Sequence, residues 1–236
     1  MPRREVPHGA IVLILDLGPT LRFTHRFGGA CIARHDGGFV AGIVETPVFT
    51  ATDGAQEGVQ VMFTPAGAGR LLGLPVAALG GAVQGVGERI AGLDALSARL
   101  RDTRGWPARF AVLEAWLHAR AAAAREVPRE LALAWDALRR GGMPVARLAS
   151  ALGWSERRLA RRFTAEFGLP PKRAARLLRF DRARQLLGAG VSAAEAAARC
   201  GYADQPHLAR EVRAFSGLTP AALHRATLPD EGGLGA

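Results

Sequence analysis

Apolar residues recur along this chain at two spacings, one in the first quarter and another in the remainder. In residues 1–64, short apolar runs alternate with polar residues and end at glycine-containing turns, a pattern typical of β-strands. The strands predicted by these runs cover residues 11–15, 21–27, 39–44, 48–52 and 59–64. The pattern therefore predicts a small antiparallel β-rich region at the N-terminus.

Beyond Pro65 the apolar positions recur every three or four residues, which predicts helices. The predicted helices cover residues 66–72, 88–100, 106–124, 130–139 and 171–187. The helix at residues 106–124 has a proline in its first turn, where proline is well tolerated. Its apolar stripe either packs in its own core or forms a surface for self-association, and it consists of Trp106, Phe110, Leu113 and Leu117.

One pattern occurs twice, first as VARLASALGWSERRLARRFTAEFGLPP in residues 145–171 and then as AAEAAARCGYADQPHLAREVRAFSGLTP in residues 193–220. Gly153 aligns with Gly201, and after one extra residue in the second copy Leu159 aligns with Leu208. In each copy a short apolar helix ends at a glycine, and a polar residue follows that can cap a second helix. Each copy therefore predicts a helix-turn-helix unit.

Residues 128–225 resemble the DNA-binding domain of AraC/XylS-type transcription regulators, in which a long helix joins two helix-turn-helix units. In the second copy the family pattern is matched by Ala197, Gly201, Tyr202, Asp204, Gln205, His207, Leu208, Arg210, Val212, Arg213, Gly217, Thr219 and Pro220. A second stretch resembles the N-terminal regions of some of these regulators, through Phe63, Pro65, Gly67, Ala68, Leu71, Leu72, Gly73 and Pro75.

The pattern and the resemblance together predict an α+β chain. A small antiparallel β-rich N-terminal domain with trailing helices, for sensing or dimerisation, is expected at residues 1–126. An all-α domain of two helix-turn-helix units joined by a long helix is expected at residues 127–228, and a frayed tail at residues 229–236.

Charge is distributed unevenly along the chain, whose formal net charge is +10. Residues 142–225 contain 15 basic and 6 acidic residues, a net charge of +9, so nearly all of the excess lies in the repeat. Binding to the phosphates of double-stranded DNA requires a positive surface of this kind. The charge therefore agrees with the function that the resemblance implies.

The residues expected to contact DNA lie at the start and on the outward face of each second helix. In the first unit they are Ser155, Glu156, Arg157, Arg158, Arg161 and Arg162, and in the second unit Asp204, Gln205, Pro206, His207 and Arg210. Arginine can pair with guanine through two hydrogen bonds, whereas Pro206 removes a hydrogen-bonding option. We expect the first unit to carry more of the specificity, and the alternative for each arginine is a phosphate contact or a solvated face.

Other chemistry has little support in the sequence. His25, Cys31 and His35 are the only cluster of metal-ligand residue types, and their spacing matches no common zinc pattern. We expect no metal, no cofactor and no catalytic site. The chain has two cysteines, which fits a reducing cytoplasm, and Cys200 is expected in the core. The apolar run at residues 10–15 is too short to span a bilayer. A cytoplasmic protein is expected.

These observations predict a sequence-specific DNA-binding transcription regulator that inserts two recognition helices into successive major grooves. Double-stranded DNA is the expected partner, and RNA polymerase, a small-molecule effector and a second copy of the chain are further candidates. Two alternatives stay open: an architectural DNA binder of low specificity, and a metal-dependent N-terminal enzyme that the rear half tethers to DNA.

Overall fold

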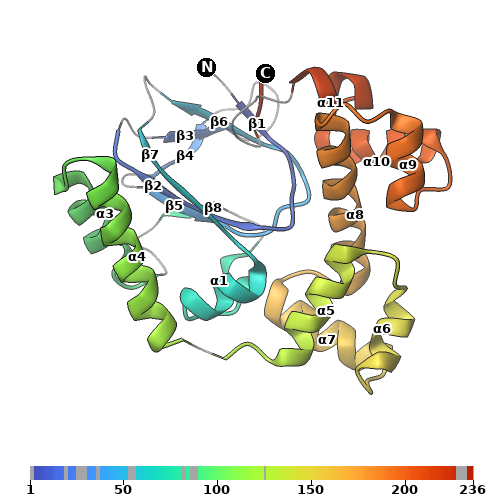
Figure 1. The fold of residues 1–236 in the computed structure, drawn as a ribbon, viewed down its shortest axis with the longest axis horizontal. Coiled ribbons are helices and arrows are strands. Elements are labelled where there is room, and N and C mark those ends of the chain that lie inside the picture. The colour runs from blue at the N-terminus through green and yellow to red at the C-terminus, as the bar shows by residue number, and fades with distance from the viewer. Residues whose placement is uncertain are drawn as a thin grey trace.

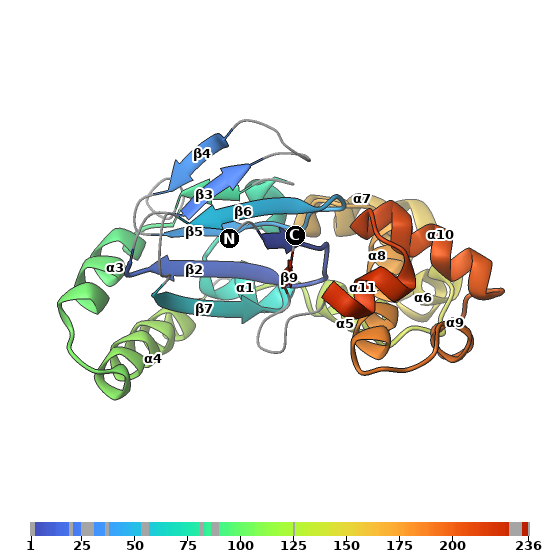
Figure 2. The same ribbon diagram turned by 90° about the horizontal axis from the view of Figure 1, so that it is seen from above.

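The computed structural model describes residues 3–18, 21–24, 31–35, 38–52, 57–80, 83–85, 90–124, 126–226 and 233–235. It has the predicted α+β architecture, with antiparallel sheets followed by an all-α part that holds two helix-turn-helix units (Figure 1). Both views place the strands between α3 and α4 on one side and α8 on the other (Figure 2).

The N-terminal part contains two antiparallel sheets. One sheet has the order β4-β3-β6-β1-β9, with the strands Cys31–His35, Leu21–Thr24, Val48–Thr52, Arg3–Glu5 and Gly233–Gly235. The other has the order β7-β2-β5-β8, with the strands Gly58–Phe63, Ile11–Asp16, Gly38–Ala41 and Val83–Gly85. Strand β2 pairs on both sides, from Ile11 opposite Phe63 to Leu15 opposite Gly38, so it lies at the centre of its sheet.

The five predicted strands are present, although β5 ends at Ala41 and the predicted strand continued to residue 44; residues 25–27 lie outside the described residues. Strands β1, β4, β8 and β9 are not predicted by the alternation of apolar and polar residues. Of the predicted frayed tail the structure describes Gly233–Gly235, which form β9 and pair with β1, and fraying of residues 229–236 stays a prediction. These pairings are held by backbone hydrogen bonds, which a one-dimensional apolar pattern does not record.

Among the described residues after β7, the helical segments before the C-terminal part are α1 at Pro65–Leu71, the 3₁₀ turn η1 at Val76–Leu79, α3 at Leu93–Asp102 and α4 at Trp106–Ala122, and β8 lies between η1 and α3. The hydroxyl of Thr64 caps α1 by accepting a hydrogen bond from the Gly67 N–H at 3.1 Å. Helix α3 begins at Leu93, because Gly92 precedes it with a φ of +83°, which is outside the helical region; residues 88 and 89 of the predicted helix lie outside the described residues.

The C-terminal part is all α. Its helices are α5 at Arg129–Arg140, α6 at Val145–Ala151, α7 at Glu156–Phe167, α8 at Pro171–Gly188, α9 at Ala193–Cys200, α10 at Gln205–Ser216 and α11 at Pro220–Ala226. Helix α8 connects the first unit, α6 and α7, to the second unit, α9 and α10 (Figure 1). The predicted long connecting helix is therefore confirmed.

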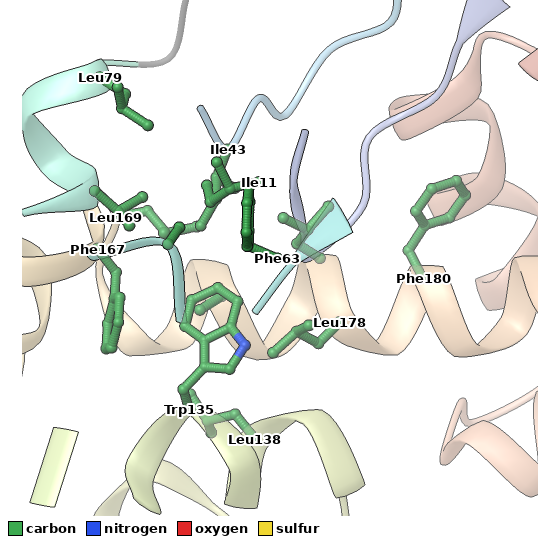
Figure 3. Close-up of a cluster of buried hydrophobic side chains, with 14 of the residues drawn as sticks. Ile11, Ile43, Phe63, Leu79, Trp135, Leu138, Phe167, Leu169, Leu178 and Phe180 are labelled. Carbon is green, nitrogen blue, oxygen red and sulfur yellow. The ribbon is translucent and has the colours of Figure 1, made fainter. Parts of the chain in front are cut away.

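One hydrophobic core runs through both parts of the chain (Figure 3). The Trp135 ring of α5 stacks on Phe163 with 5.7 Å between ring centroids and lies 5.0 Å from the Phe167 ring, both in α7. The same cluster includes Ile11 and Phe63 from the sheet. The core therefore crosses the boundary expected at residue 127, which stays a prediction.

Polar contacts also join the two parts. The Arg4 guanidinium of β1 donates to the Ser216 carbonyl at the end of α10, with 3.0 Å between Nη1 and O. Arg173 of α8 pairs with Glu45, which follows β5, with 2.9 Å between Nε and Oε1. The N-terminal part thus contacts α8 and the second unit directly.

Candidate nucleic-acid interface

The two turns have the geometry that the repeat predicts. Gly153 and Gly201 have φ values of +66° and +72°, in the left-handed region that favours glycine. The Ser155 hydroxyl accepts from the Arg158 N–H at 3.2 Å, and the Asp204 carboxylate accepts from the His207 N–H at 2.6 Å. Both second helices therefore start with a side-chain N-cap, and both are 12 residues long.

Helix α7 has one buried face and one basic face. Leu159 and Phe163 are fully buried, at 0% exposure. The opposite surface is exposed and carries Glu156, Arg157, Arg158, Arg161 and Arg162. Helix α7 therefore exposes more arginines than α10 does. An exposed helix face of this kind is able to enter a major groove.

Helix α10 presents a different surface. Gln205, Pro206 and Arg210 are exposed at its start and on its outward face. The His207 ring is partly buried and lies edge-on to Tyr202, with 5.2 Å between ring centroids, and its Nδ1 lies 3.4 Å from the Ala203 N–H. The structure therefore gives His207 a role in shaping the turn, beside its predicted contact with DNA. Arg213 is a further exposed cation on this helix and lies outside the predicted site.

A buried ion pair holds α10 on the connecting helix. The Glu211 carboxylate of α10 lies 2.6 Å from Arg176 Nε and 3.1 Å from Arg179 Nη2, both in α8, and the Glu211 side chain is 7% exposed. Arg179 lies over the Tyr202 ring at 4.5 Å. Burial and then the Glu211 charge raise the pKa of Tyr202 above its usual range, so its hydroxyl stays neutral.

The two turns differ in the aromatic that follows each glycine. Tyr202 is separated from its N-cap by the extra residue Ala203 and is buried, at 6% exposure. Trp154 directly precedes its N-cap, Ser155, and is half-buried. Two arginines of α7 lie over its ring, Arg158 at 4.9 Å and Arg162 at 5.3 Å from the centroid. Trp154 is not among the predicted site residues, although its spacings of four residues to Arg158 and eight residues to Arg162 place all three on one side of the chain in a helical repeat.

Helix α8 sets the separation of the two units. Its 18 residues span about 27 Å at 1.5 Å per residue. Successive major grooves on one side of B-DNA lie about 34 Å apart. A connector of this length, together with the width of the units, can place α7 and α10 in neighbouring grooves.

The metal candidates fall largely outside what can be described. His25 lies outside the described residues, and for Cys31 and His35 the structure describes only the backbone, in β4. No group of three potential metal ligands occurs among the described side chains. Cys200 is buried as predicted, and burial raises the pKa of its thiol. Within the described ranges, every helix is too short or too polar to cross a bilayer.

Comparisons with known proteins agree with this geometry. Residues 148–226 match the family model described as a helix-turn-helix domain. The search of curated proteins found no match to this chain. A transcriptional regulator with an AraC-type DNA-binding domain from Chromobacterium violaceum is 25% identical, with a TM-score of 0.38, over 43% of this chain and 91% of that chain.

Two solved structures of ToxT match most of the chain. ToxT from Vibrio cholerae O395 bound to (E)-4-(8-methylnaphthalen-1-yl)but-3-enoic acid is 10% identical, with a TM-score of 0.51, over 94% of this chain and 92% of that chain. ToxT from Vibrio cholerae strain SCE256 with a bound unsaturated fatty acid is 8% identical, with a TM-score of 0.51, over 94% and 89%. At these identities the likeness establishes the shared fold, from the sheets through both helix-turn-helix units.

Proposed function

We propose that this chain, whose residues 148–226 form an AraC-type helix-turn-helix domain, is a sequence-specific DNA-binding transcription regulator. Helices α7 and α10 enter successive major grooves, so that one chain covers about two turns of DNA. The outward residues of α7 supply most of the base contacts, and Gln205 and Arg210 of α10 supply the remainder together with phosphate contacts.

The observation that carries this proposal is the pairing of two capped second helices on one connector. Each helix has a buried apolar face and an exposed polar face, and α8 fixes their separation. The excess of positive charge lies in the same segment. An architectural binder needs the charge but not two groove-shaped surfaces at a fixed spacing, which is why we favour sequence-specific binding.

We further propose that the N-terminal part controls DNA binding, through a second copy of the chain or through a small-molecule effector. Trp106 and Phe110 of α4 are 40% and 48% exposed, and their rings lie 5.8 Å apart. Large exposed aromatics of this kind favour association of two copies of the chain. Sedimentation of the wild type and of Phe110→Ala tests this association. We expect the wild type to form a dimer that the substitution weakens.

ToxT has been solved with an unsaturated fatty acid bound, which motivates the effector alternative. A long-chain fatty acid that changes the affinity of this protein for DNA would support an effector role for the N-terminal part. An unchanged affinity, combined with a dimer that Phe110→Ala disrupts, would assign control to pairing.

Selection of binding sites from random double-stranded DNA at physiological salt tests the main proposal. The wild type should enrich a motif with two half-sites about one helical turn apart. Arg157→Ala and Arg161→Ala should each relax the preference at one position of one half-site. Binding without an enriched motif would overturn sequence-specific regulation and favour the architectural alternative.

A further inference from the structure

Trp154 has an unusual position for an aromatic residue next to a recognition helix. The side chain packs against the hydrophobic core and is therefore anchored. Part of it remains accessible, because Trp154 is half-buried where its counterpart Tyr202 is buried. The cause is local: Trp154 directly precedes the N-cap Ser155, whereas Ala203 separates Tyr202 from the N-cap Asp204.

The guanidinium groups of Arg158 and Arg162 lie over this ring, 4.9 Å and 5.3 Å from its centroid. Both distances are within the range of a cation–π interaction, and tryptophan is the strongest aromatic partner. The interaction uses the flat face of a guanidinium, so the N–H groups at its edge remain able to donate hydrogen bonds. The two arginines are therefore held in place without losing their donors.

The neighbouring arginines lack this support. Arg157 and Arg161 are exposed, and neither side chain makes a hydrogen bond, ion pair or ring contact with any residue that the structure describes. Residues one position apart on a helix point about 100° from each other, since 3.6 residues make one turn. Helix α7 thus carries two separate rows of arginines, one held by Trp154 and one free to move.

We propose that Trp154 is a positioning residue that holds Arg158 and Arg162 as a fixed clamp for the DNA phosphates beside the groove. Phosphate positions vary little with sequence, so donors already in place bind them with less loss of side-chain freedom. Base edges differ from site to site, which suits the mobile row of Arg157 and Arg161. This inference rests on the proposed function and assigns separate tasks to the arginines of α7.

A double-mutant cycle tests the clamp on the duplex enriched by the wild type and on a random duplex of equal length. Arg158→Ala should weaken binding to both duplexes about tenfold, the loss of one charge-assisted hydrogen bond. It should also reduce the slope of log Kd against log salt by about 1, without changing base preference. In a Trp154→Leu background the same substitution should have a much smaller effect, because the clamp is already lost.

Arg157→Ala is the matched control, because Arg157 lies on the same helix and does not contact the ring. Its effect should be the same with Trp154 and with Trp154→Leu, and Trp154→Phe should retain most of the coupling to Arg158. Thermal unfolding of each variant checks that the fold persists. Additive effects of Trp154→Leu and Arg158→Ala, or a changed base preference in Arg158→Ala, would overturn the clamp.

A measurement without DNA separates this inference from the proposed function. In nuclear magnetic resonance spectra, the side-chain N–H resonances of Arg158 and Arg162 should be shifted by the Trp154 ring, and the shift should disappear in Trp154→Leu. Unshifted resonances in the wild type would refute the positioning role. Shifted resonances in a protein that binds no DNA would keep the geometry of Trp154 and refute both the clamp and the proposed function.

Discussion

The two helix-turn-helix units have the same backbone plan but are attached to the molecule in different ways. Helix α7 of the first unit is set in an aromatic cluster, where Trp135 stacks on Phe163 and also packs against Phe167. Helix α10 of the second unit has one stacked aromatic pair, Phe180 with Phe215, and is additionally held by the Glu211 carboxylate. Both units are attached by apolar packing, and the second unit has a buried carboxylate as an additional attachment.

The two units also differ in the arginines that they leave available on the surface. The first unit exposes four arginines on its second helix, whereas the second unit uses two arginines of α8 to bind Glu211. A cation engaged in an internal ion pair is less available to a phosphate. The comparison indicates that a helix packed by apolar contacts can offer its charges to DNA, and it supports the first unit as the main source of specificity.

The largest effect is expected at Trp135, which is 1% exposed and lies at the meeting point of α5, α7 and the sheet. Trp135→Ala should lower the free energy of unfolding by about 4 kcal/mol, the typical result of removing a large buried aromatic. Urea unfolding followed by circular dichroism measures the loss. Trp106→Ala, at a residue 40% exposed, is the control and should change stability far less.

Hydrogen exchange on the same variant sharpens the comparison. Amides of α7 should lose protection in Trp135→Ala, because the Trp135 ring contacts Phe163 and Phe167 of that helix, while amides of α10 should lose less. Equal losses in α7 and α10 would show that the two units are not attached independently.

A smaller effect is expected at Glu211. Glu211→Gln keeps the shape of the side chain but removes the charge that Arg176 and Arg179 bind, leaving two cations close together. Because Arg176 is 51% exposed, solvent screens part of this effect, and the loss should be about 2 kcal/mol and not the larger value of a fully buried pair. Stability of the second unit is read from exchange of the α10 amides.

Glu195 provides the matched control, since its ion pair with Arg199 in α9 is exposed on both sides. Glu195→Gln should change stability by less than about 0.5 kcal/mol. A loss at Glu195 as large as that at Glu211 would contradict the importance of burial for the attachment of α10.

The N-caps should have the next largest effect. Ser155→Ala and Asp204→Ala each remove an acceptor for a backbone N–H in the first turn and should lower stability by about 1 kcal/mol. The aspartate should matter more at low salt, because its charge also interacts with the helix dipole. Asp204→Ser, which retains an acceptor, should restore most of the loss in a thermal melt, and a Ser variant no better than Ala would argue against capping.

The smallest effect is expected from pH at His8, in the segment between β1 and β2. Burial is the main cause that lowers the pKa of His8 below 6.5; Asp181 raises this pKa, and Arg184 lowers it. Below pH 6.5 the His8 side chain binds a proton more readily in the unfolded chain than in the folded one. The contribution of neutral His8 to the free energy of unfolding is therefore complete above pH 6.5 and decreases as the pH falls.

The variant His8→Asn retains an acceptor for the Ala10 N–H and cannot titrate. Its stability should therefore fall less than that of the wild type between pH 7 and pH 5, as measured by urea unfolding at each pH. Identical pH dependence in the two proteins would show that His8 is not protonated differently in the two states.

Much of the C-terminal part could be predicted from the sequence because its determinants are local. Gly153, Gly201, Ser155 and Asp204 fix turns and helix starts through backbone conformation and capping, and these features involve residues close together in the chain. The connecting helix likewise follows from its own apolar face. The predicted DNA contacts remain predictions, although α7 presents its members on one exposed surface.

The features that sequence reasoning missed depend on distant partners or on one inserted residue. Strand β1 has the sequence Arg-Arg-Glu, which has no apolar alternation, and it exists because β6 pairs with it in register from Arg3 opposite Thr50. Strand β9 similarly requires β1. The exposure of Trp154 is associated with the absence of a residue equivalent to Ala203. The alignment of the two copies shows this difference, but it does not show that Arg158 and Arg162 lie over the Trp154 ring.

The hydrogen bond between Arg4 and the Ser216 carbonyl spans 212 residues of sequence. Because the chain is made from its N-terminus, Arg4 leaves the ribosome long before Ser216 has been synthesised. The end of α10 can be joined to β1 only after α10 itself has been synthesised. Final placement of the second unit is thus later than synthesis of the first unit, and a bulky group next to β1 should interfere with it before it interferes with the first unit.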